Sequence, residues 1–293
     1  MISASLVKEL RELTGAGMLD CKKALEASNG DIKEATTWLR EKGIAKAAKK
    51  ESRIAAEGLS DIVIDGNTAV VLEVNSETDF VAKNSEFTDL VKTIGEAILN
   101  NDVKTNEDVL NINVNGETIN DIIVAKTAKI GEKLSFRRFE KVTKTDSQNF
   151  GSYIHAGGRI AVLITLEGAS EDVAKEVAMH AAAMRPSYVK SSDVPTEVLD
   201  KEKAIMKEQL LNEGKPADRI DNILVGKVNK YYEDVCLENQ IYVKAENKES
   251  VSKYVSNNNG SIVGMVRFEV GEGMEKRQED FASEVAKQIN GEF

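Results

Sequence analysis

Residues 60–83, SDIVIDGNTAVVLEVNSETDFVAK, decide the fold of this chain. Apolar and polar residues alternate on both sides of the turn Asp65-Gly66-Asn67, which is the pattern of a β-hairpin. Directly afterwards the spacing becomes helical, with an apolar stripe formed by Phe87, Leu90, Val91, Ile94, Ala97 and Ile98. We therefore expect a hairpin whose sheet packs against a helix.

The same pattern occurs a second time. Residues 152–175, SYIHAGGRIAVLITLEGASEDVAK, align without a gap with residues 60–83. The turn glycine is kept, since Gly66 matches Gly158, and so is the alternation of the buried face. We interpret the two segments as related hairpin-plus-helix subdomains.

The first 43 residues show helical spacing instead of alternation. Three short amphipathic stretches contain Leu6, Val7, Leu10 and Leu13, then Leu19, Ala24 and Leu25, then Ile32, Ala35, Trp38 and Leu39. Glycine-containing turns at 14–17 and 29–30 separate the stretches, and Gly43 is expected to end the unit. Three helices of this size match a ubiquitin-associated-like bundle, a docking module that has no room for an active-site cavity.

The remaining patterns complete an α+β class. We expect a helix over Ile119 to Ile130, strands over Leu134 to Val142 and Ser261 to Val270, an antiparallel helical hairpin from Val198 to Leu211 and Asp218 to Tyr231, and a final helix with Phe281, Val285 and Ile289. The predicted segments are a docking module at 1–43, a basic linker at 44–57, a first core subdomain at 58–142, a second at 143–194 and 232–272, a coiled-coil helical hairpin inserted at 195–231, and a C-terminal helical module at 273–293.

Composition indicates a folded protein whose partners are proteins. The chain is 41% hydrophobic and 30% charged, and its apolar runs are strand-sized, so we expect no membrane contact; the absence of an export signal predicts a cytoplasmic location. A net charge of −10 disfavours direct nucleic-acid binding. The local basic run from Lys42 to Arg53 is more typical of a solvated linker helix than of a binding patch. Cys21 and Cys236 lack metal-site spacing and are expected to be ordinary reduced cysteines.

A search for catalytic motifs finds none, so we expect no covalent chemistry, no cofactor and no metal. Gly271-Glu272-Gly273 is more typical of a plain turn than of a phosphate loop, because no lysine accompanies it. His180 lies in a helical run and is expected to be a satisfied structural residue. His155 lies at the hairpin turn of the second copy, where a turn role and a partner contact both stay open.

One residue breaks the internal repeat. Thr78-Asp79-Phe80 aligns with Ser170-Glu171-Asp172, so a hydroxyl and an acid recur, as expected if both copies cap and begin a helix there. Phe80 alone replaces a soluble aspartate by an aromatic ring. The pattern by itself favours packing of this ring into the core and leaves open that it anchors a partner, as buried aromatics do at interfaces.

Five stretches form a recognisable set of motifs: Leu6 to Arg11 with Thr14 to Leu25, Thr78-Asp79-Phe80-Val81-Ala82-Lys83, Lys129-Ile130-Gly131-Glu132, the His155 hairpin, and Arg267 to Gly273. On these motifs, and along nearly its whole length, the chain resembles the bacterial elongation factor Ts family. The resemblance implies a guanine nucleotide exchange factor that binds elongation factor Tu and releases GDP so that GTP can rebind.

The resemblance also implies roles for individual residues. Thr78, Asp79, Phe80 and Val81 would form a wedge that disturbs the Mg²⁺ and phosphate site of the partner. Further partner contacts would come from Arg11, Met18, Leu19, Lys22, Ile130, Gly131 and His155. The competing hypothesis is a ubiquitin-associated-like adaptor that binds nascent chains or other proteins; it would need only residues 1–43. Whether a homodimer forms within the complex stays open.

Overall fold

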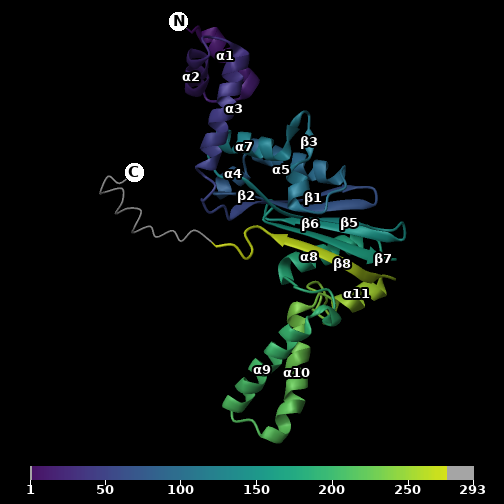
Figure 1. Cartoon of the computed structure of the whole chain (residues 1–293). Coiled ribbons are helices and arrows are strands. Elements are labelled where there is room, and N and C mark those ends of the chain that lie inside the picture. The colour runs from purple at the N-terminus through teal and green to yellow at the C-terminus, as the bar shows by residue number, and fades with distance from the viewer. Residues whose placement is uncertain (1, 276–293) are drawn as a thin grey trace. The chain divides into compact units, whose positions relative to one another are not determined.

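The computed structural model describes residues 2–275 and confirms an α+β protein built from helices and antiparallel sheets (Figure 1). The chain forms two compact units. The first contains residues up to Val63, Leu72–Phe139 and the described residues from Glu269 on; the second contains Ile64–Val71 and Glu140–Phe268. This division is coarser than the predicted segments, which stay a prediction.

The first unit begins with the expected three-helix module. Its helices are α1 (Ala4–Thr14), α2 (Met18–Ala27) and α3 (Ile32–Ala48), and its centre contains the fully buried Leu10, Cys21 and Leu25. Gly15 ends α1 in the left-handed conformation with φ 64°, which glycine adopts without steric cost.

The prediction that Gly43 ends this unit is wrong for the third helix. Helix α3 continues through Gly43 to Ala48, because Ile44 to Ala48 contain mostly good helix formers and no proline. Gly43 faces α7, where a Cβ at this position would lie 3.4 Å from the Cβ of Ala128. This is an ordinary van der Waals distance, and α3 continues past Gly43 beside α7 without a stop.

The rest of the first unit contains most of the first hairpin and its helices, whereas the end of the hairpin at Ile64–Val71 belongs to the second unit. Strands β1 (Glu57–Asp65), β2 (Thr68–Ser76) and β5 (Ser135–Thr143) form a sheet in the order β1-β2-β5. They are accompanied by α4 (Asp79–Ala82), α5 (Ser85–Leu99), α6 (Asn106–Leu110), the small hairpin β3 (Asn113–Val114) and β4 (Glu117–Thr118), and α7 (Ile119–Ile130). Helix α5 packs closely on the sheet, because a Cβ on Gly95 would meet Val63 at 2.6 Å.

The second unit contains the second copy. Strands β6 (Gln148–His155), β7 (Ile160–Glu167) and β8 (Ser261–Glu269) form a sheet in the order β6-β7-β8, and His155 pairs with Ile160 at the hairpin end. The unit also contains α8 (Glu171–Met184), η1 (Ser191–Asp193) and α11 (Val251–Asn257). Gly151 allows α8 to approach β6, since a Cβ there would lie 2.0 Å from the backbone of Ala174.

Two long helices confirm the expected helical hairpin. They are α9 (Thr196–Asn212) and α10 (Ala217–Val235), which lie side by side (Figure 1). The predicted final helix with Phe281, Val285 and Ile289 lies outside the described residues. Within residues 2–275, no helix combines the length and the apolar character that a membrane span needs.

The two copies differ at one point that matters for the site. In the second copy, α8 runs without a break from Glu171 to Met184. In the first copy, the equivalent helix α4 ends after one turn, and α5 begins again at Ser85 with Asn84 as its cap. The Asn84 side chain accepts a 2.8 Å hydrogen bond from the Glu86 backbone N–H. Phe80 therefore lies on a separate helical turn.

Candidate protein-docking site

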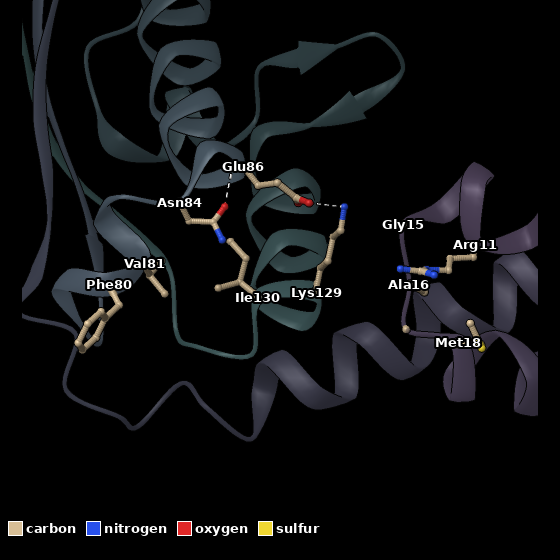
Figure 2. Close-up of a pocket in the computed structure, with 11 residues that line it drawn as sticks. Arg11, Gly15, Ala16, Met18, Phe80, Val81, Asn84, Glu86, Lys129 and Ile130 are labelled. Atoms are coloured by element: carbon tan, nitrogen blue, oxygen red, sulfur yellow. Dashed lines mark hydrogen bonds and ion pairs between the residues drawn. The ribbon is translucent and has the colours of Figure 1, made fainter. Parts of the chain in front are cut away.

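Within the first unit, an open hollow of about 630 Å³ lies between the three-helix module and α4 and α7. One wall consists of Arg11 on α1, Met18 at the start of α2 and the turn residues Gly15, Ala16 and Gly17 between them. The other wall consists of Phe80, Val81, Asn84, Glu86, Lys129 and Ile130. Figure 2 shows Phe80 and Ile130 on one side, Arg11 and Met18 on the other, and Lys129 between them. The hollow thus gathers predicted site residues from three distant stretches of sequence.

Phe80 points outward on this wall. Its side chain is 79% exposed, whereas that of the next residue, Val81, is only 8% exposed. The interpretation that Phe80 packs into the core is therefore wrong. Asp79 is exposed as well and forms a 3.4 Å ion pair with Lys83, a contact that stabilises little in water.

Thr78 occupies the N-cap position of α4, but its hydroxyl forms no cap hydrogen bond. The hydroxyl donates to Glu132 Oε1 at 2.7 Å, and the Thr78 backbone N–H donates to Glu132 Oε2 at 2.9 Å. The expected capping role of this hydroxyl is wrong, because the carboxylate of Glu132 offers a stronger, charged acceptor. Ser170 in the second copy does cap its helix, since it accepts a hydrogen bond from Val173.

The predicted residues of the docking module divide into two sets. Arg11 and Met18 line the hollow. Leu19 is 75% exposed but does not line it, and Lys22 forms an exposed 3.8 Å ion pair with Glu26. Met18 is 61% exposed, so Met18 and Leu19 together present an apolar surface at the start of α2. Exposed apolar side chains grouped in this way are typical of interaction surfaces.

Ile130 and Gly131 form the end of α7. Ile130 lines the hollow, while Gly131 ends the helix in the left-handed conformation with φ 90°. The Gly131 carbonyl accepts a 2.6 Å hydrogen bond from the Lys50 ammonium. This end of α7 therefore connects the wall of the hollow with the segment that follows α3.

The basic run has a structural role in this unit. Lys46 pairs with Asp20 at 2.8 Å, Lys50 binds Gly131, and Arg53 pairs with Glu77 at 3.3 Å. Arg40, just before the run, pairs with Asp121 of α7 at 3.2 Å. Several charges of the run thus form exposed pairs, within the module through Lys46 and with the rest of the unit through Lys50 and Arg53, while the role of residues 44–57 as a linker stays a prediction.

Glu86 organises the opposite wall. Its carboxylate binds Lys129 at 2.5 Å and Lys126 at 3.1 Å. The hydrogen bond from Lys129, followed by that from Lys126, holds the pKa of this carboxyl below its usual value against the opposing effect of burial. The Lys129 ammonium lies over the α1–α2 turn, where a Cβ on Gly15 would meet it at 2.5 Å.

His155 belongs to the second unit and does not line the hollow. It is exposed at the end of β6, and its Nδ1 lies 3.1 Å from the hydroxyl of Tyr153. A role in partner binding stays a prediction. His180, in contrast, is fully buried and hydrogen bonded on both ring nitrogens, as expected for a structural residue.

The turn at Gly271-Glu272-Gly273 is occupied by the protein itself. The Gly271 N–H donates a 2.9 Å hydrogen bond to the carboxylate of the fully buried Glu73, so a protein anion lies where a phosphate loop would hold its ligand. Residues 2–275 contain no cluster of three or more His, Cys, Asp or Glu side chains arranged to hold a metal ion.

Sequence reasoning missed two residues that shape the site, Glu86 and Glu132. Glu132 stood in the quoted stretch 129–132 but had no role of its own. Its partner Thr78 lies 54 positions earlier, and a lone acid after a helix-ending glycine carries no pattern that predicts such a contact.

An exposed aromatic ring beside exposed apolar side chains and an open hollow is typical of a protein-binding surface, here on a protein of the α+β class. The family model described as Elongation factor TS matches residues 77–272, more than half of the chain. Proteins named Elongation factor Ts from Limosilactobacillus reuteri (strain DSM 20016), Limosilactobacillus fermentum (strain NBRC 3956 / LMG 18251) and Acholeplasma laidlawii (strain PG-8A) are 50%, 50% and 49% identical to it, each over 99% of both chains. The chain belongs to the elongation factor Ts family of translation elongation factors.

Proposed function

We propose that this chain binds elongation factor Tu with GDP and promotes GDP release, so that GTP can rebind. The observation that supports the proposal most directly is the 79% exposed ring of Phe80, which no structural role requires, beside a hollow that Arg11 and Met18 also line. Family membership supplies the partner class.

The wedge consists of Thr78, Asp79, Phe80 and Val81. Phe80 enters the partner and Asp79 places a carboxylate near the site of Mg²⁺ and phosphate, where it weakens the binding of both. Val81 fixes the turn to the core and Thr78 fixes it to Glu132. No covalent bond is made or broken in this mechanism, and the protein needs no cofactor of its own.

Docking residues complete the interface. Met18 and Leu19 supply apolar contact area, Arg11 and Lys22 supply positive charge, and Ile130 with Gly131 supplies the neighbouring rim. His155 contributes a contact from the second unit. We expect no direct contact with nucleic acid or membrane and a cytoplasmic location.

The driving force is a difference in affinity. A factor that binds nucleotide-free partner more tightly than GDP-bound partner must weaken GDP binding by the same ratio, because the two binding equilibria are linked. An interface that fits both states equally well would release nothing, however tight it is. The wedge is the element that distinguishes the two states.

The release of fluorescent mant-GDP from purified elongation factor Tu tests the proposal. We expect Phe80→Ala to reduce the stimulated rate about tenfold or more, because loss of a central aromatic anchor costs roughly 2 kcal/mol at a hot spot. Asp79→Ala should reduce it as well. Both side chains are exposed, so circular dichroism and the unfolding midpoint should match those of the wild-type protein.

The exposed Glu117 on β4 provides a matched control in the same unit, and Glu117→Ala should release GDP at the wild-type rate. An unchanged stimulated rate in both wedge variants would remove the wedge from the mechanism. Failure of the wild-type protein to accelerate release, combined with capture of many different client proteins from a bacterial lysate, would favour the adaptor hypothesis.

A further inference from the structure

Two neighbouring carboxylates join the wedge to the turn that follows α7. Glu132 accepts hydrogen bonds from both the backbone N–H and the hydroxyl of Thr78, at 2.9 and 2.7 Å. In the reverse direction, Glu77 accepts a 2.6 Å hydrogen bond from the backbone N–H of Lys133. Residues 77–78 and 132–133 therefore hold each other in a reciprocal pair of contacts, which we name the carboxylate clamp.

Additional contacts make the clamp part of a wider support. The Glu77 carboxylate also binds Arg53 at 3.3 Å, and the Lys133 ammonium donates to the backbone carbonyls of Glu51 and Arg53. On the wedge itself, the Ser76 hydroxyl donates to the Thr78 carbonyl at 2.9 Å. The backbone just before Phe80 is thus fixed from several directions.

The second copy shows what the clamp replaces. There, Ser170 uses its hydroxyl locally and accepts from the Val173 N–H, so the hydroxyl stabilises its own helix. Thr78 occupies the equivalent position but gives its hydroxyl to Glu132 and leaves α4 without a side-chain cap. A local cap has been exchanged for a long-range contact, at the copy that carries Phe80.

We propose that Glu132 is a positioning residue for nucleotide exchange, which acts through Thr78 to hold Phe80 and Asp79 in the direction that the wedge requires. The inference rests on the proposed function. A wedge that must distort its partner transmits force only if its base is fixed, and loss of that fixation spreads the ring over many directions. Such a loss affects the step in which nucleotide is expelled more than it affects docking, because Arg11, Met18 and Leu19 are unchanged.

The test separates these two steps. The rate of mant-GDP release is measured over a range of factor concentrations, which gives a maximal rate and a half-saturating concentration. We expect Glu132→Ala to lower the maximal rate about tenfold while the half-saturating concentration changes less than about threefold, since a group used only after docking affects the maximal rate.

A conservative variant and a matched control are measured together with Glu132→Ala. Glu132→Gln keeps an amide oxygen that can accept from Thr78, so we expect it to recover most of the maximal rate. Glu117→Ala removes an exposed glutamate of the same unit and should behave as wild type. In a Thr78→Val background, Glu132→Ala should have a smaller effect than in the wild-type background, because the two groups share one contact.

Two results would overturn the inference. One is an unchanged maximal rate in Glu132→Ala with a wild-type unfolding midpoint. The other is an increased half-saturating concentration at full maximal rate, which would make Glu132 a direct partner contact. Phe80→Ala serves as the reference: if it slows release while Glu132→Ala does not, the positioning role fails and the proposed function stands; if neither wild type nor variant accelerates release, the proposed function itself fails.

Discussion

At the scale of single residues, the direction of Phe80 follows from that of Val81. Consecutive residues on a helix point about 100° apart, so the burial of Val81 in the core turns the ring of Phe80 toward solvent. The break after α4 isolates this one turn from α5. An aromatic ring at a strand-to-helix junction packs in either direction, so only the neighbouring contacts could decide between the two interpretations.

A second residue, His180, makes the stability of the second unit depend on pH. Its Nδ1 accepts from the Val243 N–H at 3.2 Å, so Nε2 carries the proton and donates to Gln240 at 3.0 Å. The Gln240 amide in turn donates to the carbonyls of Met184 and Asp234 at the ends of α8 and α10. Burial lowers the pKa of His180, because the charged imidazolium would lose its hydration.

The sign of the pH effect follows from this direction. Below the ordinary histidine value of 6.5, the unfolded chain binds a proton that folded His180 does not. We therefore expect the free energy of unfolding to fall between about pH 7.5 and 5.5, by up to about 1.4 kcal/mol per pH unit from this group. Urea titrations across this range measure it, and His180→Gln should flatten the dependence.

The other histidine provides the control. His155→Gln removes an exposed imidazole and should keep the wild-type pH dependence. If the free energy of unfolding changes equally with pH in the wild-type protein and in His180→Gln, another group is responsible for the pH dependence.

At the scale of secondary-structure elements, the extension of α3 beyond Gly43 changes the role of the basic run. A flexible linker would leave the three-helix module free to move relative to the core. The pairs Lys46–Asp20 and Arg40–Asp121, together with the bond from Lys50 to Gly131, hold α3 against α2 and α7. The two walls of the hollow are thus set by contacts within one unit.

Gly15 tests whether this fixed geometry matters. A Cβ at Gly15 would be strained at φ 64° and would displace the Lys129 ammonium, which lies 2.5 Å away and binds Glu86. We expect Gly15→Ala to destabilise the protein by about 1 kcal/mol and to raise the half-saturating concentration for GDP release severalfold, because the hollow changes shape.

Gly116→Ala is the matched control. Gly116 also has a positive φ, 94°, but a Cβ there would meet nothing within 4 Å. It should have a similar cost in stability and leave GDP release unchanged. If Gly15→Ala and Gly116→Ala stimulate GDP release from the partner with the same half-saturating concentration, Lys129 has no part in the shape of the docking site.

The secondary-structure elements also show which parts of the fold can be predicted from the sequence. Hairpins, α5, α7 and the α9–α10 hairpin could be predicted because each has a regular spacing of apolar residues. The end of α3 could not, because a glycine is common at helix ends but does not require one, and most of the residues that follow Gly43 are good helix formers. Phe80 was singled out by the comparison of the two copies, and Arg11, Met18 and Ile130 were found through a family resemblance. Glu86 and Glu132 depend on tertiary contacts that no local pattern contains.

At the scale of the whole molecule, one cysteine lies in each compact unit. Cys21 and Cys236 are both fully buried, and burial raises the pKa of the Cys236 thiol to about 11. We expect neither thiol to react with iodoacetamide at pH 8 in the native protein, because the thiolate is the reactive species and both sulfurs are shielded.

Peptide mass spectrometry after pulse labelling in increasing urea measures this directly. Labelling of Cys21 reports unfolding of the first unit and labelling of Cys236 reports unfolding of the second. Rapid modification of either thiol without urea would contradict the burial of that cysteine. A homodimer within the complex with the partner stays a prediction. Size-exclusion chromatography with light scattering, on the chain alone and on the complex, measures the oligomeric state.

The four residues from Ile130 to Lys133 each make a different contact. Ile130 lines the hollow, Gly131 binds Lys50, Glu132 binds Thr78 and Lys133 binds Glu77. Because these contacts follow one another without a spare position, the length of this turn is constrained more tightly than its composition. One inserted residue would shift every later contact out of register, whereas the open turn at Gly116 has room for additional residues.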